Sequence, residues 1–199
     1  MAEESSGKTN LFWKYGTAFF DLLVVTVLVL LGFALILPFA FAFCGSVAYL
    51  AKDIRSRRLS GIFRFARENF SILLRLEILL LFMWVFPILA FFVIPATAPG
   101  YGFVIFVAYT VLILSFVILL NAPAVIEKMR VNLRQLVSNA YLLVLGSPVY
   151  SFLILTLAGV VTYLSIAVDP LFALALGLIA WADSYMNYMS FGKVAKKKG

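Results

Sequence analysis

Histidine is absent from this sequence of 199 residues, and cysteine occurs only once, at Cys44. A single cysteine excludes an internal disulfide and any metal site built from several cysteines. Without histidine, metal-dependent hydrolysis would need a cluster of carboxylates, but the Asp and Glu residues are few and scattered. The sequence also lacks P-loop, G-x-S-x-G and H-E-x-x-H motifs. We therefore expect a protein that is not an enzyme and that uses no cofactor and no metal.

Charged residues are scarce as well, at 13% of the chain, whereas hydrophobic residues make up 64%. A soluble domain has about 25% charged and about 45–50% apolar residues. Several apolar runs approach or exceed the ~20 residues that a helix needs to cross a bilayer. No Gly/Ser-rich linker interrupts the chain. These features predict an all-α integral membrane protein with one transmembrane domain over residues 1–199.

The net charge of +7 has its origin in Lys and Arg residues that cluster at the ends of the apolar runs. This arrangement is typical of the cytoplasmic anchors of membrane proteins. Because the sequence has no module that reads grooves or stacks bases, we expect no nucleic-acid partner. The expected partner is the lipid bilayer, and the expected location is the cell membrane. The lysines at the end of the sequence (Lys193, Lys196, Lys197 and Lys198) place the C-terminus in the cytoplasm.

Hydrophobic periodicity predicts two kinds of helix, namely membrane spans and short amphipathic elbows that lie in the interface before them. The predicted spans cover about 21–37, a short arm at 39–52, 72–94, 103–122, 150–168 and 171–188. The predicted elbows cover about 10–20, 60–71 and 130–145. The chain can be read as three pseudo-repeated units of elbow helix plus helical hairpin, because a shift of 70 residues places Arg64 on Arg134 and Asn69 on Asn139.

The number of spans depends on Pro38, since proline bends or ends a helix. If residues 21–50 form one bent helix, the protein has five transmembrane helices and an external N-terminus. If Pro38 marks a tip, it has six helices and both ends are cytoplasmic. Lys14 and the amphipathic lead-in before the first span favour six.

Several polar residues fall within the predicted spans, where ionisable groups are costly and are usually paired. They are Asp21, Arg75, Glu77, Asn121 and Asp183. In one interpretation their side chains extend to the membrane interface or form structural pairs across the bundle, such as Arg75 with Asp21 or Asp183. In the other, they line a polar vestibule on the cytoplasmic side that binds a ligand or partner.

Basic residues of the loops and elbows form a second set of candidates. They are Arg55, Arg57, Arg58, Arg64, Arg67, Arg130 and Arg134. Such residues contact anionic lipid or a partner protein in some membrane proteins. In others they only anchor the topology.

Three segments resemble the YesL-like family of bacterial multi-pass membrane proteins, whose function is uncharacterised. The first is Leu37-Pro38 with the arm that carries Gly45, Ala48, Tyr49 and Lys52; the second is FRFARENF at 63–70; the third is Ala122-Pro123 with Asn139-Ala140. The sequence departs from the family at 39–41, where Phe-Ala-Phe replaces the usual Thr-containing turn. The resemblance implies a gene neighbourhood of carbohydrate ABC-transporter components and supplies no catalytic residues.

We therefore expect a non-enzymatic accessory or interaction protein linked to carbohydrate ABC transport. Its expected partners are ABC-transporter subunits or further copies of the chain. The alternative is a small transporter or channel with a polar vestibule on the cytoplasmic side.

Overall fold

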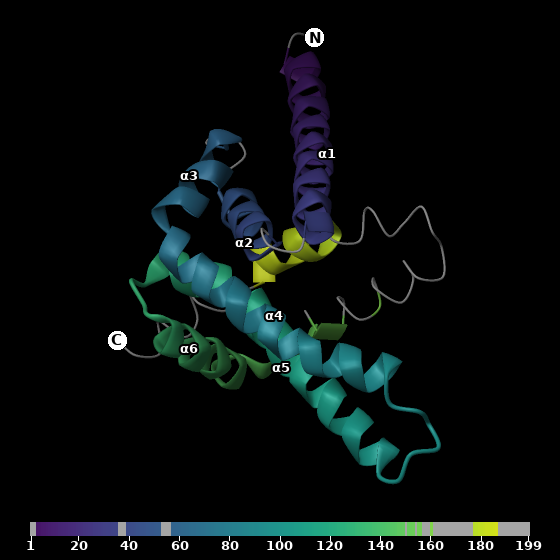
Figure 1. Ribbon diagram of the computed structural model, residues 1–199. Coiled ribbons are helices and arrows are strands. Elements are labelled where there is room, and N and C mark those ends of the chain that lie inside the picture. The colour runs from purple at the N-terminus through teal and green to yellow at the C-terminus, as the bar shows by residue number, and fades with distance from the viewer. Residues whose placement is uncertain are drawn as a thin grey trace.

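The computed structural model describes residues 3–35, 39–52, 57–149, 151–153, 155–156, 160 and 177–186, and in these ranges the regular structure is helical. Figure 1 shows the labelled helices and a further helix over 177–186. The labelled helices are α1 (Glu3–Leu35), α2 (Phe39–Leu50), α3 (Ser60–Glu68), α4 (Phe70–Phe92), α5 (Tyr101–Lys128) and α6 (Leu133–Gly146). The predicted all-α class is therefore confirmed for this part of the chain.

Helices α4 and α5 form a hairpin (Figure 1), and both are long and apolar enough to cross a membrane. α5 contains the predicted span 103–122, and α4 covers the predicted span 72–94 except for its last two residues. Trp84 Nε1 donates a hydrogen bond to Ser115 Oγ at 2.9 Å and so joins the two helices. Gly100 precedes α5 with φ 78°, a left-handed conformation that glycine adopts without a Cβ clash. α5 continues past Pro123 because Ala124, Val125 and Ile126 are buried and hold the helix in place.

Helix α1 is continuous from Glu3 to Leu35, so the prediction of a separate elbow at 10–20 is wrong. No proline interrupts this stretch, and a single glycine such as Gly16 costs a helix only about 1 kcal/mol. The amphipathic pattern at 10–20 therefore belongs to the first half of one long helix and does not mark a separate short helix.

Helix α2 packs along α1 and returns toward its N-terminal half (Figure 1). Tyr49, near the end of α2, lies against Asp21, far from the end of α1 at Leu35. The interpretation of 21–50 as one bent helix is therefore wrong, and the arm predicted at 39–52 is a separate helix that turns back. Pro38 itself lies outside the described residues.

The two later elbows are present as short helices. Asn69 breaks the helix between α3 and α4 with φ −109° and ψ 18°, and its side chain donates to the Phe65 carbonyl. α6 begins at Leu133, later than predicted, because Asn132 is its N-cap and forms a capping box with Gln135. The predicted order of elbow, helix, tip and helix is therefore present, with α3 as the elbow and α4 and α5 as the helices on either side of the tip. Most of the predicted spans 150–168 and 171–188 lies outside the described residues.

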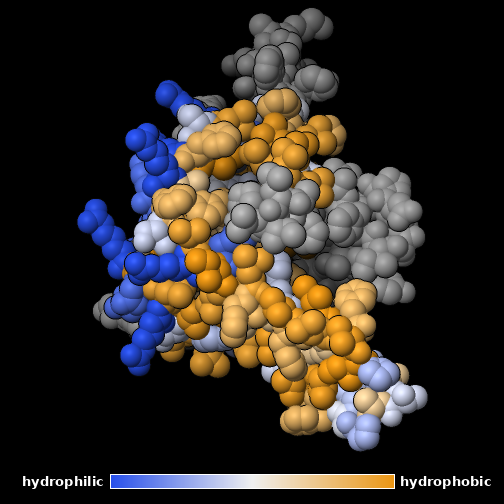
Figure 2. Space-filling view, viewed as in Figure 1, coloured by the Kyte–Doolittle hydropathy of each residue, from blue (hydrophilic) through white to orange (hydrophobic). Residues whose placement is uncertain are grey.

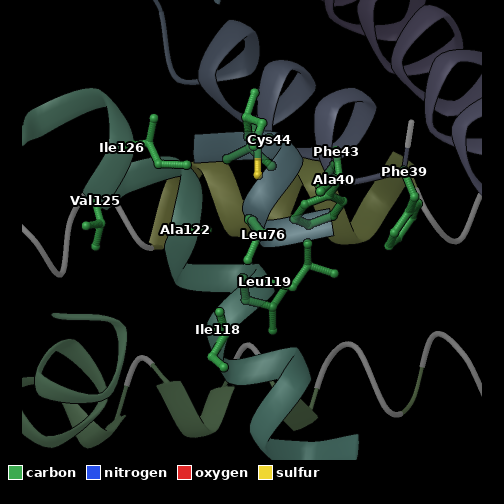
Figure 3. Packing of buried hydrophobic residues seen from close by; sticks show 14 of the residues in the cluster. Phe39, Ala40, Phe43, Cys44, Leu76, Ile118, Leu119, Ala122, Val125 and Ile126 are labelled. Carbon is green, nitrogen blue, oxygen red and sulfur yellow. The ribbon is translucent and has the colours of Figure 1, made fainter. Parts of the chain in front are cut away.

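Helix α2 is the centre of the described core, because it packs against α1, α3, α4 and α5. Its side chains are buried almost throughout. Figure 3 shows Phe43 and Cys44 of α2 beside Leu76 of α4 and Leu119 of α5. The sulfur of Cys44 is fully buried in this cluster, in keeping with the apolar surroundings of this residue in the sequence.

The contact between α2 and α3 depends on Gly45. A Cβ at this position would lie 2.9 Å from Ile62 Cγ2 and 3.2 Å from the Ile62 carbonyl oxygen. We expect Gly45→Val to lower the free energy of unfolding by about 1–3 kcal/mol, because the overpacked contact must shift. Thermal unfolding of the full chain in detergent measures this change. Gly61→Ala is the control, since no atom lies within 4 Å of its added methyl group. Equal stability of the two variants would contradict a close α2–α3 contact.

Candidate functional site

The N-terminal end of α2 meets a carboxylate from a different helix. Glu77 of α4 is buried, and its Oε2 accepts a hydrogen bond from the Ala40 backbone N–H at 2.5 Å. The Phe39 amide lies against the same carboxylate. The first amides of a helix have no partner within the helix and carry a partial positive charge. Glu77 supplies both the acceptor and the negative charge that this buried helix end requires.

The opposite end of α2 meets a guanidinium. Arg57 Nη2 donates to the Leu50 carbonyl at 2.6 Å, and Nε donates to the Lys52 carbonyl at 2.9 Å. Arg57 Nη1 also forms an ion pair with Asp21 Oδ2 of α1 at 2.8 Å. Tyr49 Oη donates to the other oxygen of Asp21 at 2.6 Å. Both charged side chains are largely buried, with 12% of Arg57 and 5% of Asp21 exposed.

These contacts form what we call the α2 clamp, which consists of Glu77 at one end of α2 and Arg57, Tyr49 and Asp21 at the other. The signs of the charges match the helix dipole at both ends. Burying an ion pair is costly unless further hydrogen bonds satisfy its remaining polar atoms. Here two carbonyls and a tyrosine hydroxyl provide those bonds. The clamp therefore ties α2 to α1 and α4.

Four of the five polar residues predicted inside spans are buried, namely Asp21, Glu77, Asn121 and Asp183. Asn121 donates to the Val117 carbonyl of its own helix at 2.8 Å. Arg75 is exposed, so it is not the buried polar residue that its place in a predicted span suggests, and Asp21 pairs with Arg57 and not with Arg75. Arg75 and Glu77 are two positions apart on α4, so they face different directions. Within the described part of the chain, none of the five lines the two cavities at the charged edge and beside α2.

The basic candidates divide into two groups. Arg57 belongs to the α2 clamp, so the interpretation of this residue as a lipid or partner contact is wrong. Five others are exposed, and we call them the cationic rim: Arg58, Arg64, Arg67, Arg130 and Arg134. Arg55 lies outside the described residues. Figure 2 shows hydrophilic side chains gathered along one edge of the molecule, over α3, α6 and the adjoining ends of α4 and α5.

A polar groove of about 1020 Å³ lies at this charged edge. Part of its lining comes from α3 and the start of α4, and part comes from the end of α5 and the segment that follows α5. Four basic side chains line it: Lys52, Arg64, Lys128 and Arg130. Two acidic side chains, Glu68 and Glu127, line it as well, which leaves a formal excess of two positive charges. Arg64 and Glu68 approach each other to only 3.9 Å and are both well exposed, so this pair is weak.

Sequence reasoning found Arg64 and Arg130 but missed Lys52, Lys128 and both acids of the groove. The two lysines belong to the same basic clusters and could have been included on that ground. The sequence does not predict that they meet in one groove, because this depends on how the tertiary fold places α3 opposite the end of α5. A smaller cavity of about 430 Å³ lies beside the α2 clamp and is lined by Arg57, Trp181 and Tyr185, among others.

The chemistry of the groove is that of anion binding. Guanidinium and ammonium groups are donors without acceptor atoms, and arginine matches the geometry of phosphate and carboxylate. Within the described part of the chain, no three His, Cys, Asp or Glu side chains come together as a metal site. The candidate functional site is therefore the polar groove with the cationic rim around it.

Comparison of the chain with family models, with curated proteins and with solved structures gave no match in any of the three. The resemblance to the YesL-like family stays a prediction.

We expect Arg57→Gln to lower the free energy of unfolding by about 3 kcal/mol, because it leaves the buried Asp21 carboxylate without its counter-charge. Thermal unfolding in detergent measures the loss. Arg58→Gln is the matched control, since this neighbour is exposed and its replacement should change stability by no more than about 0.5 kcal/mol. An Arg57→Gln protein as stable as the control would rule out a structural role for the ion pair.

Proposed function

We propose that this chain is a multi-pass membrane protein that acts as a non-enzymatic interaction or accessory protein and engages an acidic partner at the cytoplasmic face. The observation that carries this proposal is the cationic rim of five exposed arginines in and beside α3 and α6. Hydrophilic side chains gather along the edge of the molecule over these helices (Figure 2). A surface with charge of one sign steers association with a partner of the opposite charge.

The membrane placement is supported by the exposed apolar side chains of the α4–α5 hairpin. Phe82, Phe92, Phe103 and Phe106 are between 68% and 85% exposed. A soluble protein rarely leaves so large an apolar surface in water, but lipid covers it without cost. The tip at 93–100 lies at the end of the hairpin away from the rim (Figure 1) and carries no charged residue.

The rim sets the orientation that we propose, since loops rich in Lys and Arg stay in the cytoplasm. The tip of the α4–α5 hairpin is then external. The return of α2 along α1 supports the arrangement with six helices and both ends in the cytoplasm. Together with the two long apolar helices, it supports multi-pass insertion.

The partner that suits the rim is a protein with an acidic surface, because opposite charges steer association and fix the docking orientation. The resemblance to the YesL-like family suggests subunits of a carbohydrate ABC transporter as that partner. Anchoring the topology explains some of the positive charge. The arginines of the rim come from the segment before α3, from α3, from the segment between α5 and α6 and from the first turn of α6, so they also present a broad surface to a partner.

Neutralising the rim tests the proposal. We expect the triple variant R58Q/R67Q/R134Q to reduce the co-purifying partner by roughly tenfold, because three charges of the contact are lost. The measurement is gentle purification from native membranes with quantitative mass spectrometry of the eluate. These three residues do not line the groove, and Lys52, Arg57, Arg64 and Arg130 remain to hold the orientation.

The control is R58K/R67K/R134K, which keeps every charge and should retain most of the partner. Full retention of the partner by the neutralised variant would contradict a role for the rim. The absence of any stoichiometric partner from the native eluate would contradict the interaction function itself.

A further inference from the structure

We infer that the polar groove binds the phosphate of an anionic phospholipid headgroup. The inference rests on the membrane placement proposed above but not on the partner protein. It concerns the lining of the groove and leaves the outer arginines of the rim to the partner.

The position of the groove suits a headgroup. Its walls include Ser71 and Ile72, near the start of α4, and Ile126 and Lys128, at the end of α5. These are the ends of the two helices that are long and apolar enough to span the bilayer. In the proposed orientation, the groove therefore lies at the level of the headgroups of the cytoplasmic leaflet. Basic pockets between membrane helices at this level recognise anionic lipid headgroups in other proteins.

The charges of the groove suit a phosphate diester. Arg64 of α3 and Arg130 of the segment after α5 line the groove from different elements, and guanidinium groups form strong, charge-assisted hydrogen bonds with phosphate. Arg64 is available to turn toward a ligand, because its contact with Glu68 is long and 71% of its side chain is exposed. Glu127 lies near Lys52 and Lys128 and offsets part of their charge. The formal excess of two positive charges stays in the groove.

The lining and the volume favour a lipid over a free phosphate ion. Phe65, Ile72, Ile126 and Val131 contribute apolar surface next to the basic side chains. A volume of about 1020 Å³ greatly exceeds the volume of an inorganic phosphate ion. A glycerol backbone and the first methylenes of an acyl chain would cover the apolar part, as burial of apolar surface favours.

The test uses the purified full chain in a non-ionic detergent, with native mass spectrometry to count bound lipid during titration. The probes are phosphatidylglycerol and zwitterionic phosphatidylcholine. We expect phosphatidylglycerol to bind about tenfold more tightly than phosphatidylcholine, and R64Q/R130Q to abolish this preference. The matched control is R67Q/R134Q, which removes two arginines of the rim outside the groove and should keep the preference within about twofold of the native value.

Equal binding of the two lipids by the native protein would overturn the inference, as would an unchanged preference in R64Q/R130Q with helical circular dichroism intact. Displacement of phosphatidylglycerol by equimolar inorganic phosphate would overturn the lipid assignment and identify the groove as a site for the free ion. Because no partner is present in this experiment, its failure is distinguishable from failure of the proposed function. If the protein prefers phosphatidylglycerol but no partner co-purifies with it from native membranes, the lipid site in the groove would stand and the proposed interaction function would be contradicted.

Discussion

The buried ion pair between Asp21 and Arg57 is the interaction on which the rest of the described structure depends. It joins α1 to the segment after α2, and the same guanidinium closes the C-terminal end of α2. Glu77 closes the other end from α4. A helix as short as α2 has little stability of its own, since isolated helices below about 12–15 residues are marginal. Packing and the charges at its two ends therefore hold it in place.

The α2 clamp also connects the core to the candidate site. Arg57 donates to the Lys52 carbonyl, and Lys52 lines the polar groove. The same segment leads into α3, whose Ile62 packs closely against Gly45 of α2. The position of α3, and with it that of Arg64, thus follows from the position of α2. A groove whose walls are fixed in this way binds a ligand with less loss of conformational entropy than a set of mobile loops would.

Local sequence patterns predicted the positions of the helices better than the tertiary contacts between them. The hydrophobic pattern was sufficient to predict α3 and α4. Residues 60–71 have an apolar stripe on one helix face, and residues 72–94 form a long, mostly apolar run. The elbow at 10–20 was wrong because an amphipathic pattern does not reveal whether the chain turns after it. Asp21 and Glu77 were candidates for burial because they fall within predicted spans, and both are buried. The sequence did not predict their partners, because a loop arginine 36 positions away and a backbone amide 37 positions away are fixed only by tertiary packing. For the same reason, the sequence identified the arginines of the rim but not the groove that some of them line.

The most direct test of this account is a double-mutant cycle between Asp21 and Arg57. The free energy of unfolding of the full chain would be measured in detergent for the native protein, Asp21→Asn, Arg57→Gln and the double variant. If the ion pair holds α2 in place, the losses of the single variants should not add, and the coupling energy should be about 2 kcal/mol. Losses that add to within about 0.5 kcal/mol would show that the two residues act independently. That result would contradict the central place of the ion pair in this structure.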